Sequence, residues 1–257
     1  MRAVRPRGAT LAGALAGASK ASPMSQTPLP RILDPHAVPV VGTDAHLPAV
    51  PAERLSAAAL RRRFAARAAW QPELEGDGAT HGQRPAAHAA VLVPLVQRED
   101  GLHVLLTRRT EHLRDHGGQI SFPGGRVEAH DEDLAGTALR ETHEEVGLPR
   151  ERVEVIGQMP AYTTITRFIV TPVVALVQPP FELVLDAFEV AEAFETPLAF
   201  LMDPAHHRRH VFSYAGGERQ FLSMPWQGRG ADGTPREYFI WGATAAMLRN
   251  LYRFLAG

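Results

Sequence analysis

The stretch 121–148 (SFPGGRVEAHDEDLAGTALRETHEEVGL) places the strictest limits on the fold of this chain. An apolar run is followed by Gly124 and Gly125, then by an acidic loop, and finally by a segment that stops at Gly147. Paired glycines can take the positive φ angles of a tight turn, and a glycine just past a helix can take the left-handed conformation. The stretch therefore predicts a strand, a glycine turn, an acidic loop, a helix and a helix stop, in that order.

Two stripes of opposite character run along the predicted helix. At about 100° per residue, one stripe can pack against a core while the other is anionic. The packing stripe comprises Ala135, Leu139, Thr142 and Val146, and the anionic stripe comprises Glu141, Glu144 and Glu145. Carboxylates at i, i+3 and i+4 repel one another by a few tenths of a kcal/mol per pair, and a divalent cation would relieve that cost. Taken alone, such a stripe could also be a solvated acidic face.

The whole stretch resembles the signature of the Nudix hydrolases, in which a glycine turn, an acidic loop and Arg-Glu-x-x-Glu-Glu-x-Gly bind metal and pyrophosphate. Residues 140–147 supply the last part here. Two positions depart from the family pattern. The loop acid fits Glu132, with six residues after Gly125 rather than the usual five, and Thr142 stands where an aliphatic residue is usual. The resemblance implies a Nudix-type fold, an α/β/α sandwich around a mixed β-sheet.

Residues 105–125 (LLTRRTEHLRDHGGQISFPGG) look like the motif of one branch of that superfamily, the coenzyme A pyrophosphatases. That branch also lengthens the acidic loop by one residue and often has Thr or Ala at the position of Thr142, so both departures support the resemblance. Thr110 is a mild mismatch, since Ser or Ala is usual there. The branch implies hydrolysis of the diphosphate of coenzyme A or an acyl-coenzyme A to 3′,5′-ADP and a 4′-phosphopantetheine product.

The composition limits the chemistry elsewhere in the chain. The 257 residues have a formal net charge of −1, which argues against general nucleic-acid binding because that usually needs a basic excess. The absence of cysteine excludes disulfides, thiolate metal sites and cysteine nucleophiles. No apolar run approaches the ~20 residues of a membrane-spanning helix. We therefore expect a soluble, cytoplasmic protein that acts on a small molecule away from membranes, and a homodimer is left open.

The chain is expected to have an N-terminal extension followed by one catalytic domain. The expected parts are a disordered or extended tail at 1–50, a helix and linker packing on the domain at 51–85, and the Nudix domain at 86–257. The acid-free start, 1–33, could also be a secretory signal or an organellar transit peptide. Met24 could be the true start.

Hydrophobic patterning predicts the elements around the central stretch. A helix is predicted over 52–67, strands over 88–96, 102–107, 153–159 and 168–177, and a last strand and helix over 238–241 and 242–255. Pro172 predicts an edge strand or a bulge, because proline lacks the N–H that pairs strands. His206, His207 and His210 are interpreted as a polar surface loop rather than metal ligands. The order of elements after residue 86 fits an α/β unit with helices on both faces of a mixed sheet.

The Nudix resemblance implies a metal site built from the anionic stripe. Glu144 and Glu145 are the expected principal ligands of Mg²⁺ or Mn²⁺, with Glu141 as a third ligand or as the base that deprotonates water. Gly125 would lend its backbone to the metal shell. Arg140 would hold Glu141 or another acid of the box by a charge-assisted hydrogen bond.

Further residues are expected to bind substrate or to complete the site. The substrate-binding candidates are Arg108, Arg109, Arg114, Gly124 and Gly125. The arginines could either pair with phosphate oxygens or hold the motif together. Near 189–198 many Nudix proteins carry a further acid, so Glu189 or Glu192 could complete the metal site or act as the base.

Three alternatives to coenzyme A hydrolysis remain open at this point. The first is the same chemistry on ADP-ribose, a dinucleotide or a nucleoside triphosphate, which the box does not exclude. The second is a non-catalytic Nudix-like nucleotide-binding domain, although a pure binder has no need of the complete acid set. The third is an interaction protein in which the N-terminal extension carries the function.

Overall fold

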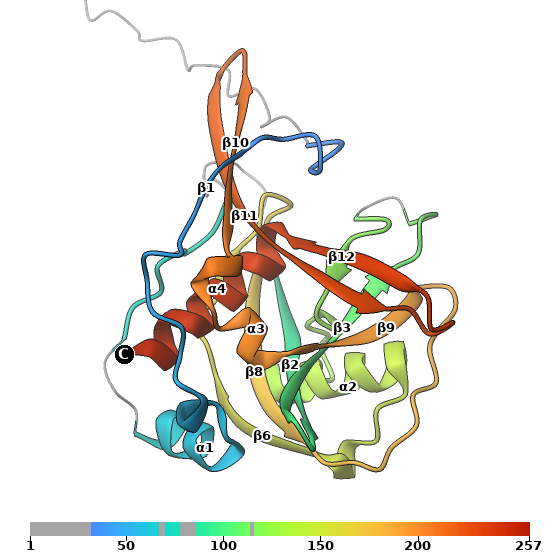
Figure 1. The fold of residues 1–257 in the computed structure, drawn as a ribbon. Coiled ribbons are helices and arrows are strands. Elements are labelled where there is room, and N and C mark those ends of the chain that lie inside the picture. The colour runs from blue at the N-terminus through green and yellow to red at the C-terminus, as the bar shows by residue number, and fades with distance from the viewer. Residues whose placement is uncertain (1–31, 67–69, 78–85, 114–115) are drawn as a thin grey trace, which may run out of the picture. The chain divides into compact units, whose positions relative to one another are not determined.

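The computed structural model describes residues 32–66, 70–77, 86–113 and 116–257 (Figure 1). The predicted tail and targeting segment lies outside the described residues up to residue 31, and the predicted linker lies outside them at 78–85. None of the helices in the described ranges is long and apolar enough to cross a membrane.

The larger sheet has the strand order β4-β3-β2-β8-β6, with β5 paired to β2, β7 to β8 and β9 to β3. β2 and β8 run parallel, and the other pairs are antiparallel, so the sheet is mixed as predicted. Its strands are β2 (Ala87–Arg98), β3 (Gly101–Arg109), β4 (Ile120–Ser121), β5 (Gly124–Arg126), β6 (Val153–Gln158), β7 (Tyr162–Thr163), β8 (Phe168–Val177) and β9 (Val190–Pro197).

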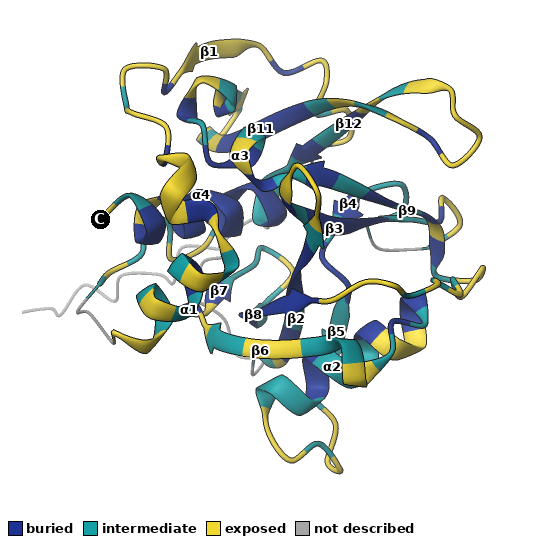
Figure 2. Cartoon of the chain, turned by 60° about the horizontal axis from the view of Figure 1, so that its bottom comes forward, coloured by how far each residue is buried: buried dark blue, intermediate teal, exposed yellow. Residues whose placement is uncertain are grey.

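Helices cover both faces of this sheet because the side chains of its central strand alternate between two cores. Leu92 belongs to the core that also holds Ala138 of α2 (Leu134–Val146). The next residue, Val93, belongs to the core that holds Leu248 of α4 (Gly242–Ala256). Successive side chains of a strand point to opposite faces, so α2 and α4 lie on opposite sides, and β2 between them is largely buried (Figure 2).

A smaller antiparallel sheet accompanies the larger one and was not predicted. Its order is β1-β10-β11-β12, with β1 (Val40–Thr43), β10 (Arg208–Tyr214), β11 (Gly217–Arg229) and β12 (Pro235–Trp241). The predicted surface loop at His206, His207 and His210 is wrong, because His207 and His210 are buried. His207 Nε2 lies 2.8 Å from the Leu201 carbonyl oxygen, and His210 Nε2 lies 2.8 Å from Ser223 Oγ. Both rings therefore satisfy core hydrogen bonds.

The helix predicted over 52–67 is divided at Ser56. The segment forms a 3₁₀ turn, η1 (Ala52–Leu55), and then α1 (Ala57–Ala65). Ser56 has an extended backbone, and its hydroxyl accepts a hydrogen bond from the N–H of Ala59 at 3.3 Å, which makes it an N-cap. The remaining short helices are η2 (Arg150–Arg152), α3 (Leu198–Leu201) and η3 (Pro204–His206).

Pro172 does not lie on an edge strand, because β8 is paired on one side with β2 and on the other with β6 and β7. The carbonyl of Pro172 accepts from Met159, so its missing N–H faces the same side. On that side the pairing passes from β6 to β7, and the bulge lies in β6 between Val155 and Gly157. The proline therefore stands where the ladder is already interrupted.

A charged cluster ties the segment before residue 86 to α4. The guanidinium of Arg249, only 1% exposed, lies 2.8 and 3.3 Å from the carboxylate oxygens of Glu73 and 3.2 Å from Asp44. Arg249 Nη1 also lies 3.1 Å from His207 Nδ1. Asp44 in turn accepts two hydrogen bonds from Arg209. Residues near 44 and 73 thus compensate a buried charge of the last helix.

Candidate active site

The glycine-containing strand β5 and the helix α2 bring the anionic stripe against the sheet. β5 pairs with β2 so that Gly125 lies opposite Ala90. A Cβ on Gly125 would overlap the carboxyl group of Glu141, so the absence of a side chain permits this close approach. The side chain of Asp133 caps α2 by accepting from the N–H of Gly136 at 2.7 Å, and Gly147 ends the helix with φ 67°. The predicted helix and its glycine stop are confirmed, whereas Gly124 and Gly125 lie in strand β5 rather than in the predicted turn.

Thr142 is buried within α2 even though it carries a hydroxyl. Its Oγ1 donates to the carbonyl of Ala138 one turn earlier, at 2.6 Å. This hydrogen bond satisfies the hydroxyl inside the helix, so threonine can occupy a position where an aliphatic residue is usual.

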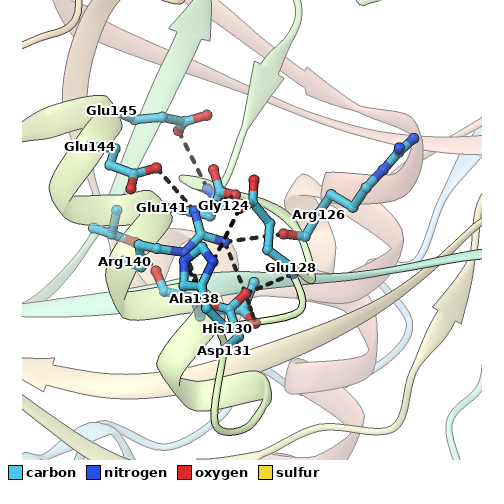
Figure 3. Close-up of polar contacts among 12 residues, drawn as sticks. Gly124, Arg126, Glu128, His130, Asp131, Ala138, Arg140, Glu141, Glu144 and Glu145 are labelled. Atoms are coloured by element: carbon cyan, nitrogen blue, oxygen red, sulfur yellow. Dashed lines mark hydrogen bonds and ion pairs between the residues drawn. The ribbon is translucent and has the colours of Figure 1, made fainter.

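Arg140 joins the acidic loop to the acids of α2 (Figure 3). Its Nε and Nη2 each donate to an oxygen of Asp131 at 2.9 Å. Nη1 donates to Glu141 at 2.9 Å and to Glu144 at 3.0 Å. Together with these carboxylates, the guanidinium forms charge-assisted hydrogen bonds of the expected kind. Its role in catalysis stays a prediction.

Asp131, rather than Glu132, is the loop acid that contacts Arg140. Asp131 also accepts from the Thr137 hydroxyl and from the N–H of Glu128, both at 2.9 Å. The hydrogen bonds from Arg140 hold the pKa of Asp131 well below its usual range. Glu132 is exposed and makes no hydrogen bond or ion pair with the described residues. With Asp131 as the loop acid, five residues separate it from Gly125, and the additional residue lies between the acid and Arg140 instead. The stretch from Gly125 to Arg140 is therefore still one residue longer than the family pattern.

Glu145 is the most buried acid of the stripe, with a side chain only 6% exposed. One carboxylate oxygen accepts from the N–H of Gly124 at 3.3 Å, and the other lies 3.6 Å from Nη1 of Arg109. Burial raises the pKa of Glu145 to about 8, against the opposing effect of Arg109. Burial also raises the pKa of Glu141, although Arg140 opposes it. The negative charge at this face of α2 is therefore only partly compensated by arginines.

The donor set suits a hard divalent cation. Glu141, Glu144 and Glu145 supply only carboxylate oxygens, which Mg²⁺ and Mn²⁺ prefer. Within the described residues no group of three His, Asp or Glu side chains surrounds a common point. Glu141 and Glu144 instead turn toward Nη1 of Arg140. A cation placed between the carboxylates would offset the free-energy cost of burying Glu141 and Glu145 in their ionised forms. These residues therefore fit the metal that the sequence implies.

Arg109 and Glu189 lie beside the box. Arg109 Nη1 is 3.6 Å from Glu145, and its Nη2 is 3.7 Å from Glu189, which precedes β9. The charge of Glu189 contributes to the raised pKa of both Glu141 and Glu145, which places its carboxylate near theirs. The structure therefore brings Arg109 and Glu189 together with the metal candidates.

Arg108 and Glu192 form a different cluster. Glu192 is buried and accepts from Arg236 at 2.6 Å, from the Tyr238 hydroxyl at 2.8 Å and from Arg108 at 3.3 Å. These donors outweigh burial and lower the pKa of Glu192. Phe194, two residues further along β9, stacks on Tyr238 with ring centroids 3.7 Å apart. Glu192 and Phe194 share a face of β9, and that face is turned toward β12 rather than α2.

The sequence analysis did not identify Arg236 or Tyr238 as neighbours of a candidate acid. Their contact with Glu192 arises only when β12 folds against β9, and no short spacing in the chain encodes it. Arg114, a predicted phosphate ligand, lies outside the described residues, and its role stays a prediction.

Comparison with known proteins decides the family. A family model of the NUDIX domain matches residues 86–213. A protein of Enterobacter sp. (strain 638) named "Uncharacterized Nudix hydrolase NudL" is 43% identical over 165 residues, which cover 63% of this chain and 80% of that protein. The chain belongs to the Nudix family. A Nudix hydrolase NudL of Salmonella paratyphi B, also uncharacterized, is 41% identical over 174 residues, covering 67% of this chain and 84% of that protein.

Solved structures of Nudix proteins are similar to this chain as well. The Nudix hydrolase RenU of M. smegmatis shares 27% sequence identity with a TM-score of 0.40, covering 48% of this chain and 79% of that one. Family membership confirms the predicted Nudix-type α/β fold and the prediction of an enzyme. The chain is therefore a Nudix hydrolase that acts on a diphosphate.

Proposed function

We propose that this Nudix hydrolase cuts the diphosphate of coenzyme A or an acyl-coenzyme A, with Mg²⁺ or Mn²⁺, to 3′,5′-ADP and a 4′-phosphopantetheine product. The observation that carries the proposal is the contact between Arg109 and Glu145 at 3.6 Å. Arg109 belongs to the upstream stretch 105–125, which resembles the coenzyme A branch, and Glu145 belongs to the box. The two sequence motifs thus contribute to one site.

The chain's own residues divide the chemical tasks as follows. A bound divalent cation neutralises phosphate charge and acidifies water. Glu144 and Glu145 would hold it, and Glu141 would be a third ligand or accept the proton of the attacking water. Arg140 keeps Glu141 in place through its hydrogen bonds to the acidic loop. Arg109 is placed to donate to phosphate oxygens, since its contacts with carboxylates are longer than hydrogen bonds.

Of the two further acids, the geometry favours Glu189. Its side chain is 42% exposed, and its one ion pair, among the described residues, is the 3.7 Å contact with Arg109. Glu192, by contrast, has both oxygens engaged by Tyr238 and two arginines. A base or ligand needs a free oxygen directed at the site, so we assign this role to Glu189.

The alternative substrates are ADP-ribose, dinucleotides and nucleoside triphosphates. The box would act on any of these diphosphates by the same chemistry, and the relatives' names give no substrate. The choice of coenzyme A depends on residues 105–125 alone.

A panel of substrates tests the proposal. The purified full chain with Mg²⁺ or Mn²⁺ is incubated separately with coenzyme A, acetyl-coenzyme A, ADP-ribose, a dinucleotide and a nucleoside triphosphate in ¹⁸O-labelled water. Mass spectrometry then identifies the products and the phosphorus that gained ¹⁸O. We expect 3′,5′-ADP from coenzyme A. The coenzyme A assignment would be falsified if coenzyme A survived while ADP-ribose or the dinucleotide was cleaved.

A matched pair of variants tests the metal site. Glu145→Gln replaces a carboxyl group that could bind the cation by an amide of nearly the same volume, and we expect turnover to fall by orders of magnitude while the fold persists. Glu132→Gln makes the same chemical change at an exposed acid two residues before the start of α2 and should retain turnover. Equal turnover of Glu145→Gln and the unchanged chain would remove Glu145 from the site.

The proposal also covers assembly and location. We keep a cytoplasmic location and leave a homodimer open. Light scattering of the full chain during size-exclusion chromatography measures the mass directly.

A further inference from the structure

An exposed aromatic pair borders the carboxylate site. Phe188 is 65% exposed, although phenylalanine side chains are usually buried. Its ring centroid lies 4.8 Å from that of His112, with the two planes inclined at 59°. His112 is exposed as well. The two rings therefore form an open aromatic corner on the surface.

The position of this pair relates it to the box. Phe188 directly precedes Glu189, and His112 follows Arg109 by three residues. Arg109 and Glu189 are themselves 3.7 Å apart beside Glu145. The aromatic corner thus stands at the edge of the groups that would hold a diphosphate.

Hydrogen bonds fix Phe188 in this exposed position. The hydroxyl of Thr110 donates to the carbonyl of Phe188 at 2.7 Å, and the N–H of Thr110 donates to the carbonyl of Glu189 at 3.0 Å. On the other side, the N–H of Asp186 donates to the carbonyl of Glu145 at 2.9 Å, while its side chain accepts from the N–H of Phe188. The backbone that carries the ring is thus tied to the residue that follows β3 and to the end of α2. The Thr110 hydroxyl makes one of these hydrogen bonds, which alanine at this position could not make.

We propose that Phe188 and His112 form a stacking site for a purine base whose nucleotide carries the diphosphate. The proposal rests on the proposed diphosphate hydrolysis and adds the base as a recognised group. A planar purine on the face of one ring would meet the edge of the other, because the rings are inclined. Base–aromatic stacking is worth roughly 5- to 150-fold in affinity when the ring is replaced by alanine. The same corner would serve any adenine-containing substrate.

Binding of two probes that differ only in the base tests this site. Adenosine 5′-monophosphate and ribose 5-phosphate contain no diphosphate, so neither is consumed by the proposed reaction. With Mg²⁺ present, calorimetric titration of the full chain should show tighter binding of the adenosine compound. Phe188→Ala should weaken that binding about fivefold or more and leave ribose 5-phosphate unchanged, and Phe188→Trp should restore it.

Val184→Ala serves as the control, since Val184 is also an exposed apolar residue of the same segment. The unfolding temperature of Phe188→Ala should match that of the unchanged chain because the ring is exposed. The proposal is overturned if the unchanged chain shows no preference for the adenosine compound, or if Phe188→Ala weakens both probes equally. Because these titrations measure binding alone, a failure to hydrolyse coenzyme A would overturn the proposed function and leave this result standing.

Discussion

Replacing Arg249 by methionine should destabilise the whole fold, because it removes the cation shared by Glu73 and Asp44. Arg249 makes hydrogen bonds of 2.8 and 3.3 Å to Glu73 and an ion pair of 3.2 Å to Asp44, and it is buried. Removing one partner of a buried charge pair costs about 3–5 kcal/mol. Since Arg209 still contacts Asp44, we expect about 3–4 kcal/mol. At about 2–4 °C per kcal/mol for a chain of this size, the unfolding midpoint should fall by roughly 6–16 °C.

Arg253→Met provides a matched control on the same helix. Arg253 lies 3.0 Å from the same Glu73 carboxylate, but its side chain is 44% exposed. An exposed ion pair contributes about 0–1 kcal/mol. Calorimetry and urea titration should therefore separate the two variants clearly. If the free energies of unfolding of Arg249→Met and Arg253→Met differ by less than about 1 kcal/mol, which is the most that an exposed ion pair contributes, the burial of Arg249 does not have the proposed energetic effect.

Three further predictions concern the site and its surroundings. Glu189→Gln should lower kcat, whereas Glu192→Gln should mainly lower the unfolding midpoint, because Glu192 contacts β12. Initial rates and unfolding midpoints are measured on both variants. A lowered midpoint for Glu189→Gln together with a lowered kcat for Glu192→Gln would contradict this assignment. Asp131→Asn should lower the unfolding midpoint at pH 7, where the carboxylate is ionised, and Glu132→Gln should leave it unchanged. The midpoints are measured by scanning fluorimetry. Equal midpoints for the two variants would refute the stabilising contact between Asp131 and Arg140. Burial lowers the pKa of His207 to about 4, so the unfolded chain binds a proton that the folded chain does not between pH 6.5 and 4. Stability should then fall by about 2 kcal/mol from pH 7 to pH 5, and His207→Gln should remove that loss in urea titrations.

Local patterns sufficed for the elements whose signals lie within a few residues. The helix before Gly147 and the strand at 168–177 occur as predicted, because a glycine stop and a β-branched run act locally. The contact of Arg140 with acids of the box was also predictable, since those acids lie one residue or one turn away on the helix.

Contacts between distant segments escaped the sequence for physical reasons. The two sides of the Glu192 cluster are 44 residues apart in the chain, and they meet through side-chain contacts between β9 of the larger sheet and β12 of the smaller sheet. His207 was expected at the surface because its neighbours in the sequence are polar. In the structure its buried ring has a hydrogen-bond partner in Arg249, which is 42 residues away in the chain. The loop acid was assigned to Glu132 from the family spacing alone, and the contact between Asp131 and Arg140 appears only in the structure. The domain boundary expected near residue 86 likewise ignored Asp44 and Glu73, and we propose that the folded unit includes both.

β1 has a consequence for work with shortened chains. It pairs with β10 through Val40, Gly42 and Thr43 and so covers the outer N–H and C=O groups of that strand. A chain that begins after residue 43 would present β10 as an unprotected edge, and exposed edges invite strand addition between molecules. Self-association of such a fragment would then reflect the missing strand, and only the full chain can report the natural assembly of this enzyme.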